Sequence, residues 1–430
     1  MTHDTDGPSL PHITDATARQ VVPPKVDPDP MDAVERPTFR GLVAIAEFRA
    51  LIIGFLLHLA SGTVATLAIS VLVYERTHSA LLSAISLASS YLPHIIGAVL
   101  LLSLADRLPA RRGLTFVSFV QVLTLGVVVL GVLPVGAILL VILLGGVAQP
   151  IGTAIRSAAL PDILGSGAQY VLGRAVVNMT SYSAQALGFA VGGVFVATVG
   201  THGALWMATA VSLVVIGVNW FGLKNRPARA TATGSALRQT WKTNGFLLRT
   251  RAIRGLLLSL WLPLTLAGGA EALFVPFAAR HGSTSLASAF FWAITAGNFA
   301  GDLLVGRLVS PARQARLSFP LALLLAAPLI CFVAQPPVII AVGLCFVSAI
   351  GASYHLGLQH RFLDVVPLQV RAQAFGLIYS GIPALQGIMF TLAGAVVAVG
   401  TPSGVIALFG LASGISTVAL ASHIHAKSKT

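Results

Sequence analysis

The 430-residue chain is 56% hydrophobic and only 10% charged, whereas soluble domains average about 25% charged residues. This composition excludes a water-soluble globular protein and predicts a polytopic α-helical membrane protein, because apolar runs near the roughly 20 residues that span a bilayer recur after the first 48 residues. The formal net charge of +13 does not indicate nucleic-acid binding, since the basic residues gather at the ends of the apolar runs.

Twelve apolar segments predict twelve transmembrane helices. Turn sequences such as Leu133-Pro134-Val135-Gly136 separate neighbouring segments. The predicted spans are 49–74, 79–105, 113–133, 135–157, 170–199, 202–222, 255–278, 283–308, 315–333, 337–361, 370–399 and 402–423.

Basic residues predict the orientation of these spans. Of the 27 Lys and Arg residues, all but Arg76 and Arg280 fall on one side of the membrane if both termini are cytoplasmic. The positive-inside rule therefore favours an even number of spans, cytoplasmic termini and a location in the inner (plasma) membrane of the cell.

The longest link between spans, residues 223–254, divides six spans from six. We interpret the chain as a disordered cytoplasmic tail and a first six-helix bundle, then a basic cytoplasmic linker, a second six-helix bundle and a short cytoplasmic tail. These regions are 1–40, 41–222, 223–254, 255–423 and 424–430. Two such pseudo-repeats around a binding site at the midplane are a common plan for transporters.

The loop after the second span reads Leu102-Ser103-Leu104-Ala105-Asp106-Arg107-Leu108-Pro109-Ala110-Arg111-Arg112. It resembles the G-x-L-A-D-R-x-G-R-R signature of the major facilitator superfamily, although Leu102 replaces the leading glycine. The counterpart after the eighth span, Gly306-Arg307-Leu308-Val309-Ser310-Pro311-Ala312-Arg313, keeps the glycine but has Ser310 at the acidic position. Val73-Tyr74-Glu75-Arg76-Thr77 is similar to the bacterial branch that contains macrolide-efflux and enterobactin-export proteins.

The resemblance implies an all-α fold of twelve transmembrane helices that transports by alternating access. It also implies a cytoplasmic latch that holds one access state closed; a solvated loop with basic anchors is the alternative. The latch residues would be Asp106, Arg107, Arg111 and Arg112, with Gly306, Arg307 and Arg313 in the second copy.

Three glycines in the fifth predicted span are similar to the end of the superfamily's antiporter motif, G-P-x-x-G-G. They are Gly188, Gly192 and Gly193, with Phe189 in place of the proline. A face of small residues spaced by four also allows close helix packing, and we favour that role.

Two carboxylates inside predicted spans are candidates for proton coupling. An ionised Glu271 within the seventh span would cost several kcal/mol, so it should face water or a partner, and the adjacent Gly and Pro residues allow the helix to break locally. A place near the outer headgroups, or a static polar pair, is the alternative. Asp302 lies near the cytoplasmic end of the eighth span, where we favour a structural ion pair with Arg307 or another basic residue.

Polar side chains on helices that line the cavity in this family are candidates for substrate contact: His58, Gln149, Arg156, Tyr354 and His355. Each could instead form a hydrogen bond between packed helices, and Arg156 could extend to the inner surface.

The sequence contains no Walker A loop, zinc-binding His/Cys cluster or serine nucleophile elbow. We therefore expect no cofactor, no metal and no enzymatic activity. The expected function is proton-coupled efflux of a small amphipathic or hydrophobic compound, such as a drug, natural product or siderophore. The expected partners are this substrate, protons and the lipid bilayer, with the monomer as the working unit. Uptake by the same fold and a non-transporting ligand sensor are the alternatives.

Overall fold

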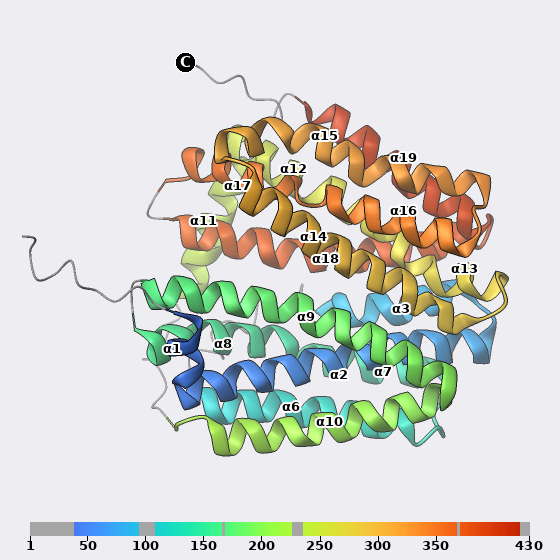
Figure 1. Cartoon of the computed structure of the whole chain (residues 1–430), viewed down its shortest axis with the longest axis horizontal. Helices are drawn as coiled ribbons and strands as arrows, with labels where there is room; N and C mark the ends of the chain where they lie inside the picture. Colours follow the sequence, from blue (N-terminus) through green and yellow to red (C-terminus); the bar gives the residue numbers. More distant parts are fainter. Residues whose placement is uncertain (1–37, 94–107, 166–167, 226–234, 368–369, 422–430) are drawn as a thin grey trace, which may run out of the picture. The chain divides into compact units, whose positions relative to one another are not determined.

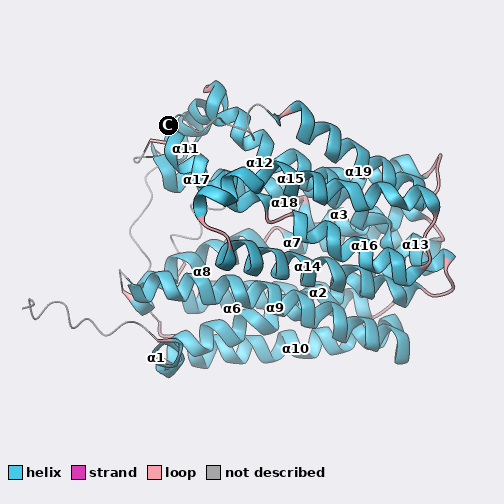
Figure 2. Cartoon of the chain, turned by 45° about the horizontal axis from the view of Figure 1, so that its top comes forward, coloured by secondary structure: helices cyan, strands magenta, loops and turns pink. Residues whose placement is uncertain are grey.

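The computed structural model describes residues 38–93, 108–165, 168–225, 235–367 and 370–421. Within these residues every regular element is a helix, and loops and turns join the helices (Figure 2). An all-helical fold is what the apolar, strand-poor sequence pattern predicts.

The first half of the chain contributes the blue to green helices of Figure 1. These are α1 (Phe39–Ala44), α2 (Ala46–Thr77), α3 (Ala80–Tyr91), α6 (Ala110–Val129), α7 (Val135–Gly146), α8 (Gln149–Leu164), α9 (Ala168–Thr198) and α10 (Gly200–Gly222). The second half contributes α12 (Arg251–Gly269), α13 (Phe274–Arg280), α14 (Ala287–Leu308), α15 (Pro311–Ile330), α16 (Val338–Gly351), α17 (Tyr354–Val365), α18 (Arg371–Val397) and α19 (Pro402–Ala419).

These helices occupy the positions of the twelve predicted spans. Among the described residues, ten of these positions hold a helix, or two consecutive helices, long and apolar enough to cross a membrane. The other two positions are filled by α3, which is followed by residues outside the described ranges, and by α9, which has 31 residues but a lower hydropathy. Exposed apolar side chains on the outer faces, such as Ile339 and Val399, suit contact with lipid tails.

The helices pack within each half and across the two halves. Helix α2 packs against α9 and α10 in the first half, and α14 packs against α16 in the second. Across the halves, α9 lies beside α14 and α3 packs against α18 (Figure 1).

Small residues permit the closest of these approaches. A Cβ atom added to Gly301 of α14 would lie 2.7 Å from the carbonyl oxygen of Ile350 on α16, so the two backbones touch there. Gly297, four residues earlier on the same face, meets the Phe346 carbonyl in the same way. Such spacing is the usual way in which membrane helices approach closely.

The seventh span is interrupted. A short 3-10 helix, η2 (Ala270–Leu273), separates α12 from α13 and contains Glu271. Pro276 has no N–H to donate to the carbonyl of Ala272, four residues earlier, and the ordinary helical ladder therefore cannot continue through this point. The local break expected from the Gly and Pro residues is present.

The link between the halves contains a helix that the sequence pattern did not predict. Helix α11 (Ser235–Arg249) lies within the segment interpreted as a basic linker, and it packs against α12 and α18. Leu247 is buried in this contact, whereas Trp241, Lys242 and Phe246 are exposed. The alternation of buried and exposed side chains makes α11 amphipathic.

Candidate functional site

A cavity of about 830 Å³ lies between the two halves and is called the central cavity below. Its volume is within the roughly 300–1,000 Å³ of typical ligand pockets. Helices α2, α8 and α9 line it from the first half, and α14, α17 and α18 line it from the second. The lining residues used in the argument are Phe55, Arg156, Arg174, Tyr182, Phe299, Asp302, His355, Gln359 and Tyr379.

A side pocket of about 370 Å³ lies in the first half and shares Phe55 and Arg156, among other residues, with the central cavity. His58, Gln121 and Gln149 also line it. Both spaces combine aromatic and polar side chains, so they suit a ligand with apolar and polar parts.

The halves touch one another at the end of the molecule that carries Arg76 and Arg280, called the closed end. Phe189 of α9 stacks on Phe291 of α14, with ring centroids 4.7 Å apart. The Thr284 hydroxyl donates a hydrogen bond of 3.1 Å to Glu75. Toward the opposite, basic end, the central cavity extends to Arg174 near the start of α9 and to Gln359 near the end of α17.

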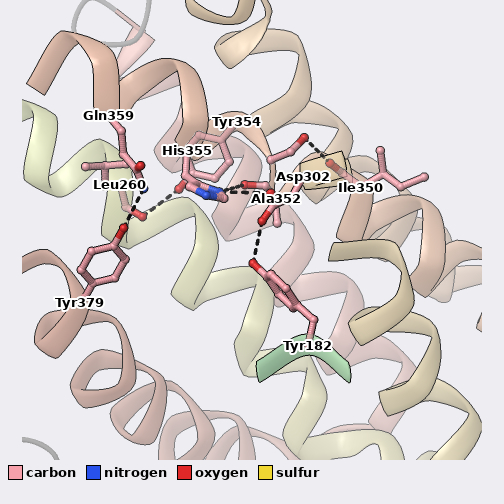
Figure 3. Close-up of polar contacts among 10 residues, drawn as sticks. Tyr182, Leu260, Asp302, Ile350, Ala352, Tyr354, His355, Gln359 and Tyr379 are labelled. Atoms are coloured by element: carbon pink, nitrogen blue, oxygen red, sulfur yellow. Dashed lines mark hydrogen bonds and ion pairs between the residues drawn. The ribbon is translucent and has the colours of Figure 1, made fainter. Parts of the chain in front are cut away.

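Asp302 brings three helices together in a group called the Asp302 cluster (Figure 3). The Tyr182 hydroxyl of α9 donates a hydrogen bond of 2.6 Å to Asp302 Oδ2, and His355 Nδ1 of α17 lies 3.9 Å from Asp302 Oδ1. His355 Nδ1 is also 2.9 Å from the Ala352 carbonyl oxygen. Of the partners expected for Asp302, which were Arg307 or another basic residue, Arg307 is exposed at the end of α14, and the basic residue near the carboxylate is His355.

Tyr182 is a site residue that the sequence analysis missed. It belongs to a polar face of α9 that also carries Asn178 and Gln185, at positions i−4 and i+3, and all three line the central cavity. Polar residues at this spacing on an otherwise apolar span were the available signal.

Arg156 lies over the ring of Phe55, with its guanidinium carbon 3.7 Å from the ring centroid. This distance is that of a cation–π contact. Arg156 lines the central cavity and the side pocket and does not extend to the membrane surface.

His58 and Gln149, predicted as separate candidates, are hydrogen-bonded to each other. His58 Nε2 lies 3.0 Å from Gln149 Oε1, and Gln149 in turn donates to Gln121 Oε1 at 3.4 Å. Gln121 Nε2 continues the network to the hydroxyls of Ser61 and Ser212. Four helices, α2, α6, α8 and α10, are thereby tied together inside the first half.

Tyr354, predicted as a candidate for substrate contact, lies outside the linings of the central cavity and the side pocket. Tyr354 is fully buried, and its hydroxyl donates to the carbonyl oxygens of Ser259 and Leu260 on α12, at 3.1 Å and 2.9 Å. Pro263 cannot donate to the Ser259 carbonyl four residues earlier. Tyr354 supplies the missing donor, so its role is to hold α17 against α12.

Glu271 is half-buried in η2 and lies outside the linings of the central cavity and the side pocket. The 3-10 turn that carries it packs against α3, α18 and α19. No hydrogen bond or ion pair engages the Glu271 carboxylate among the residues that the structure describes.

The structure describes only some of the residues predicted to form the cytoplasmic latch. Asp106 and Arg107 lie outside the described residues. Arg111 lies over the ring of Trp220 on α10 at 4.3 Å, and its buried Nε has no hydrogen-bond partner among the described residues. Arg112 and the residues of the second copy, Gly306, Arg307 and Arg313, are exposed.

The three glycines of α9 face neighbouring helices. A Cβ atom on Gly188 would lie 2.8 Å from the Ala60 carbonyl oxygen of α2, and one on Gly192 would lie 3.3 Å from Cα of Val64. Gly193 instead faces Ser288 of α14, in the other half. These positions place all three glycines at close helix contacts.

Solved structures with the same fold are membrane transporters. This chain is similar to a POT family transporter in complex with 5-aminolevulinic acid (TM-score 0.70, 10% identity, 90% of this chain and 97% of that chain covered). It is also similar to the nucleoside transporter NupG (0.69, 15%, 89% and 100%) and to a D-xylose-proton symporter (0.63, 14%, 88% and 96%). At these identities the likeness concerns the fold alone.

A search of curated protein sequences gave no match. A family model described as Major Facilitator Superfamily matches residues 50–364. Because that match covers more than half of the 430 residues and the structure has the corresponding helical architecture, the chain belongs to the Major Facilitator Superfamily.

Proposed function

We propose that this chain is a secondary transporter that exports a small amphipathic compound in exchange for protons. The observation that carries the proposal is the central cavity, which both halves line, together with the stacking of Phe189 on Phe291, which joins the halves at the closed end. A path closed on one side and extended toward the other is what one state of an alternating-access cycle requires. One chain contributes both halves, so a monomer is sufficient.

The direction of transport rests on the sequence. Basic loops favour cytoplasmic termini in the inner membrane, and the central cavity then extends toward the cytoplasm. A cavity on that side can load a compound for export. The resemblance of Val73-Tyr74-Glu75-Arg76-Thr77 to macrolide-efflux and enterobactin-export proteins supports the same direction.

Asp302 and Glu271 are the proposed coupling carboxylates. Asp302 lies in the wall of the central cavity and bonds to Tyr182 of the other half, so a change in its charge acts directly on a contact between the halves. Glu271 lies at the break of the seventh span, where a change in charge acts on the packing of η2 against α3. The ionised form of either carboxylate costs free energy inside a membrane.

Inside-out vesicles containing the protein test this function. With an imposed proton gradient, acidic, neutral and basic amphipathic compounds are added in turn while a pH-sensitive dye reports the gradient. Compounds that are exported should dissipate the gradient and accumulate in the vesicles, but not in vesicles without the protein. Accumulation only with the gradient reversed would indicate uptake, and saturable binding without any flux would indicate a ligand sensor.

A further inference from the structure

Arg156 is a cation in the wall of both ligand-sized spaces with no acidic partner among the residues that the structure describes. Asp302 is the one carboxylate among the lining residues of the central cavity, and its Oδ2 accepts the hydrogen bond from Tyr182. Arg174 adds a second cation to the same wall. The described lining therefore carries more positive than negative charge.

The place of Arg156 in α8 argues against a role in fixing the orientation of the helix. Arg156 precedes the last residue of α8, Leu164, by eight positions, which corresponds to about 12 Å at 1.5 Å per residue. Arginines that anchor a span lie at its end and meet headgroups. Arg156 contacts the ring of Phe55 inside the protein instead.

The surroundings of Arg156 suit an oxyanion. A guanidinium placed over an aromatic ring keeps the N–H donors at its edge, and those donors match a carboxylate, phosphate or sulfonate in a bidentate geometry. The aromatic residues Phe299 and Tyr379 offer apolar surface in the central cavity.

We propose that Arg156 and the ring of Phe55 form a subsite for the acidic group of the transported compound. The substrate class is an organic anion with an oxyanion head, whose apolar body lies along the aromatic part of the central cavity. This inference deepens the proposed function, and it rests on the central cavity being the transport path.

Equilibrium binding to the purified protein in nanodiscs of neutral lipid tests the subsite without requiring transport. The probes are labelled 2-naphthoate and its uncharged counterpart 2-naphthamide, which share the ring system and differ at the acidic group. We expect saturable binding of naphthoate, at least tenfold weaker binding of naphthamide, and at least a tenfold loss of naphthoate affinity in Arg156→Gln. Arg156→Lys should recover only part of the affinity, because an ammonium lacks the planar fork of donors.

Arg316→Gln is the matched control, since it removes one positive charge at an exposed position of α15, outside the linings of the central cavity and the side pocket. It should leave naphthoate affinity within about threefold of the native value. Equal losses in Arg156→Gln and Arg316→Gln would overturn the subsite and indicate attraction by overall charge. Equal binding of the two probes, unchanged naphthoate binding in Arg156→Gln, or no saturable naphthoate binding would also overturn it.

The outcomes separate this inference from the proposed function. Naphthoate binding that depends on Arg156, in a protein that moves no compound in vesicles, would retain the subsite and reject the transporter. Gradient-driven export of neutral compounds that is unaffected by Arg156→Gln would retain the transporter and reject the subsite. Thermal unfolding of each variant, compared with the native protein, identifies any loss of binding that comes from misfolding.

Discussion

Tyr182 of α9 donates a 2.6 Å hydrogen bond to Asp302 of α14, and the two residues belong to different halves of the chain (Figure 3). Hydrogen bonds to a charged acceptor are worth about 1.5–3 kcal/mol. This bond therefore contributes to holding the halves together in the present state, and any transition that separates α9 from α14 must break it.

Asp302→Asn should uncouple transport from protons. The asparagine side chain can still accept the Tyr182 hydrogen bond, but it carries no charge and takes up no proton. We expect proton-driven flux in proteoliposomes to fall at least about tenfold, which corresponds to an activation barrier about 1.4 kcal/mol higher. Exchange of labelled for unlabelled substrate without a gradient should continue. Tyr182→Phe keeps the carboxylate and loses the bond, so it should retain proton coupling. Full proton-driven flux in Asp302→Asn would remove Asp302 from the coupling mechanism.

Glu271→Gln tests the second carboxylate. It preserves the volume of the side chain in η2 and removes its charge, so the fold should remain intact because no described partner of the carboxylate is lost. We expect the dependence of transport rate on external pH to disappear. Asp364→Asn, at an exposed position near the end of α17, is the control and should retain the native pH profile. If the Glu271→Gln profile matches that of the native protein, Glu271 does not carry the proton.

Tyr354→Phe should reduce stability without changing substrate affinity. It leaves the Ser259 carbonyl, to which Pro263 cannot donate, without its donor, and an unsatisfied buried acceptor costs about 1–3 kcal/mol. The apparent Tm of the detergent-purified protein should therefore fall, while the KM for transport stays the same. His355 is the next residue but lies in the cavity wall. His355→Ala should therefore change the KM for transport and leave the apparent Tm unchanged. An altered KM in Tyr354→Phe would return this residue to the substrate path.

The sequence was sufficient to predict the fold because membrane spans are specified by length and apolar content, which are local properties. The Gly and Pro residues near Glu271 likewise predicted the break at η2. Helix α11 was not predicted because the segment is basic and lacks a long apolar run. Its apolar residues recur instead at a helical period among polar ones.

The site was harder to predict because it depends on which helices meet. His58 and Gln149 are 91 positions apart, and Tyr182 and Asp302 are 120 apart, so no local pattern pairs them. Tyr354 and His355 are adjacent, yet one is buried against α12 and the other lines the cavity. A helix turns by 100° per residue, and without a partner helix the sequence does not define the direction of either side chain.

Gly188→Ala should destabilise the first half. The added methyl group would collide with the Ala60 carbonyl oxygen of α2, which is backbone and cannot move without shifting the helix. Overpacking of this kind costs about 1–3 kcal/mol. Gly217→Ala in α10 is the matched control, because a Cβ there meets nothing within 4 Å, and it should leave the apparent Tm unchanged or slightly raised. Equal Tm values for both variants would contradict the close packing of α9 on α2.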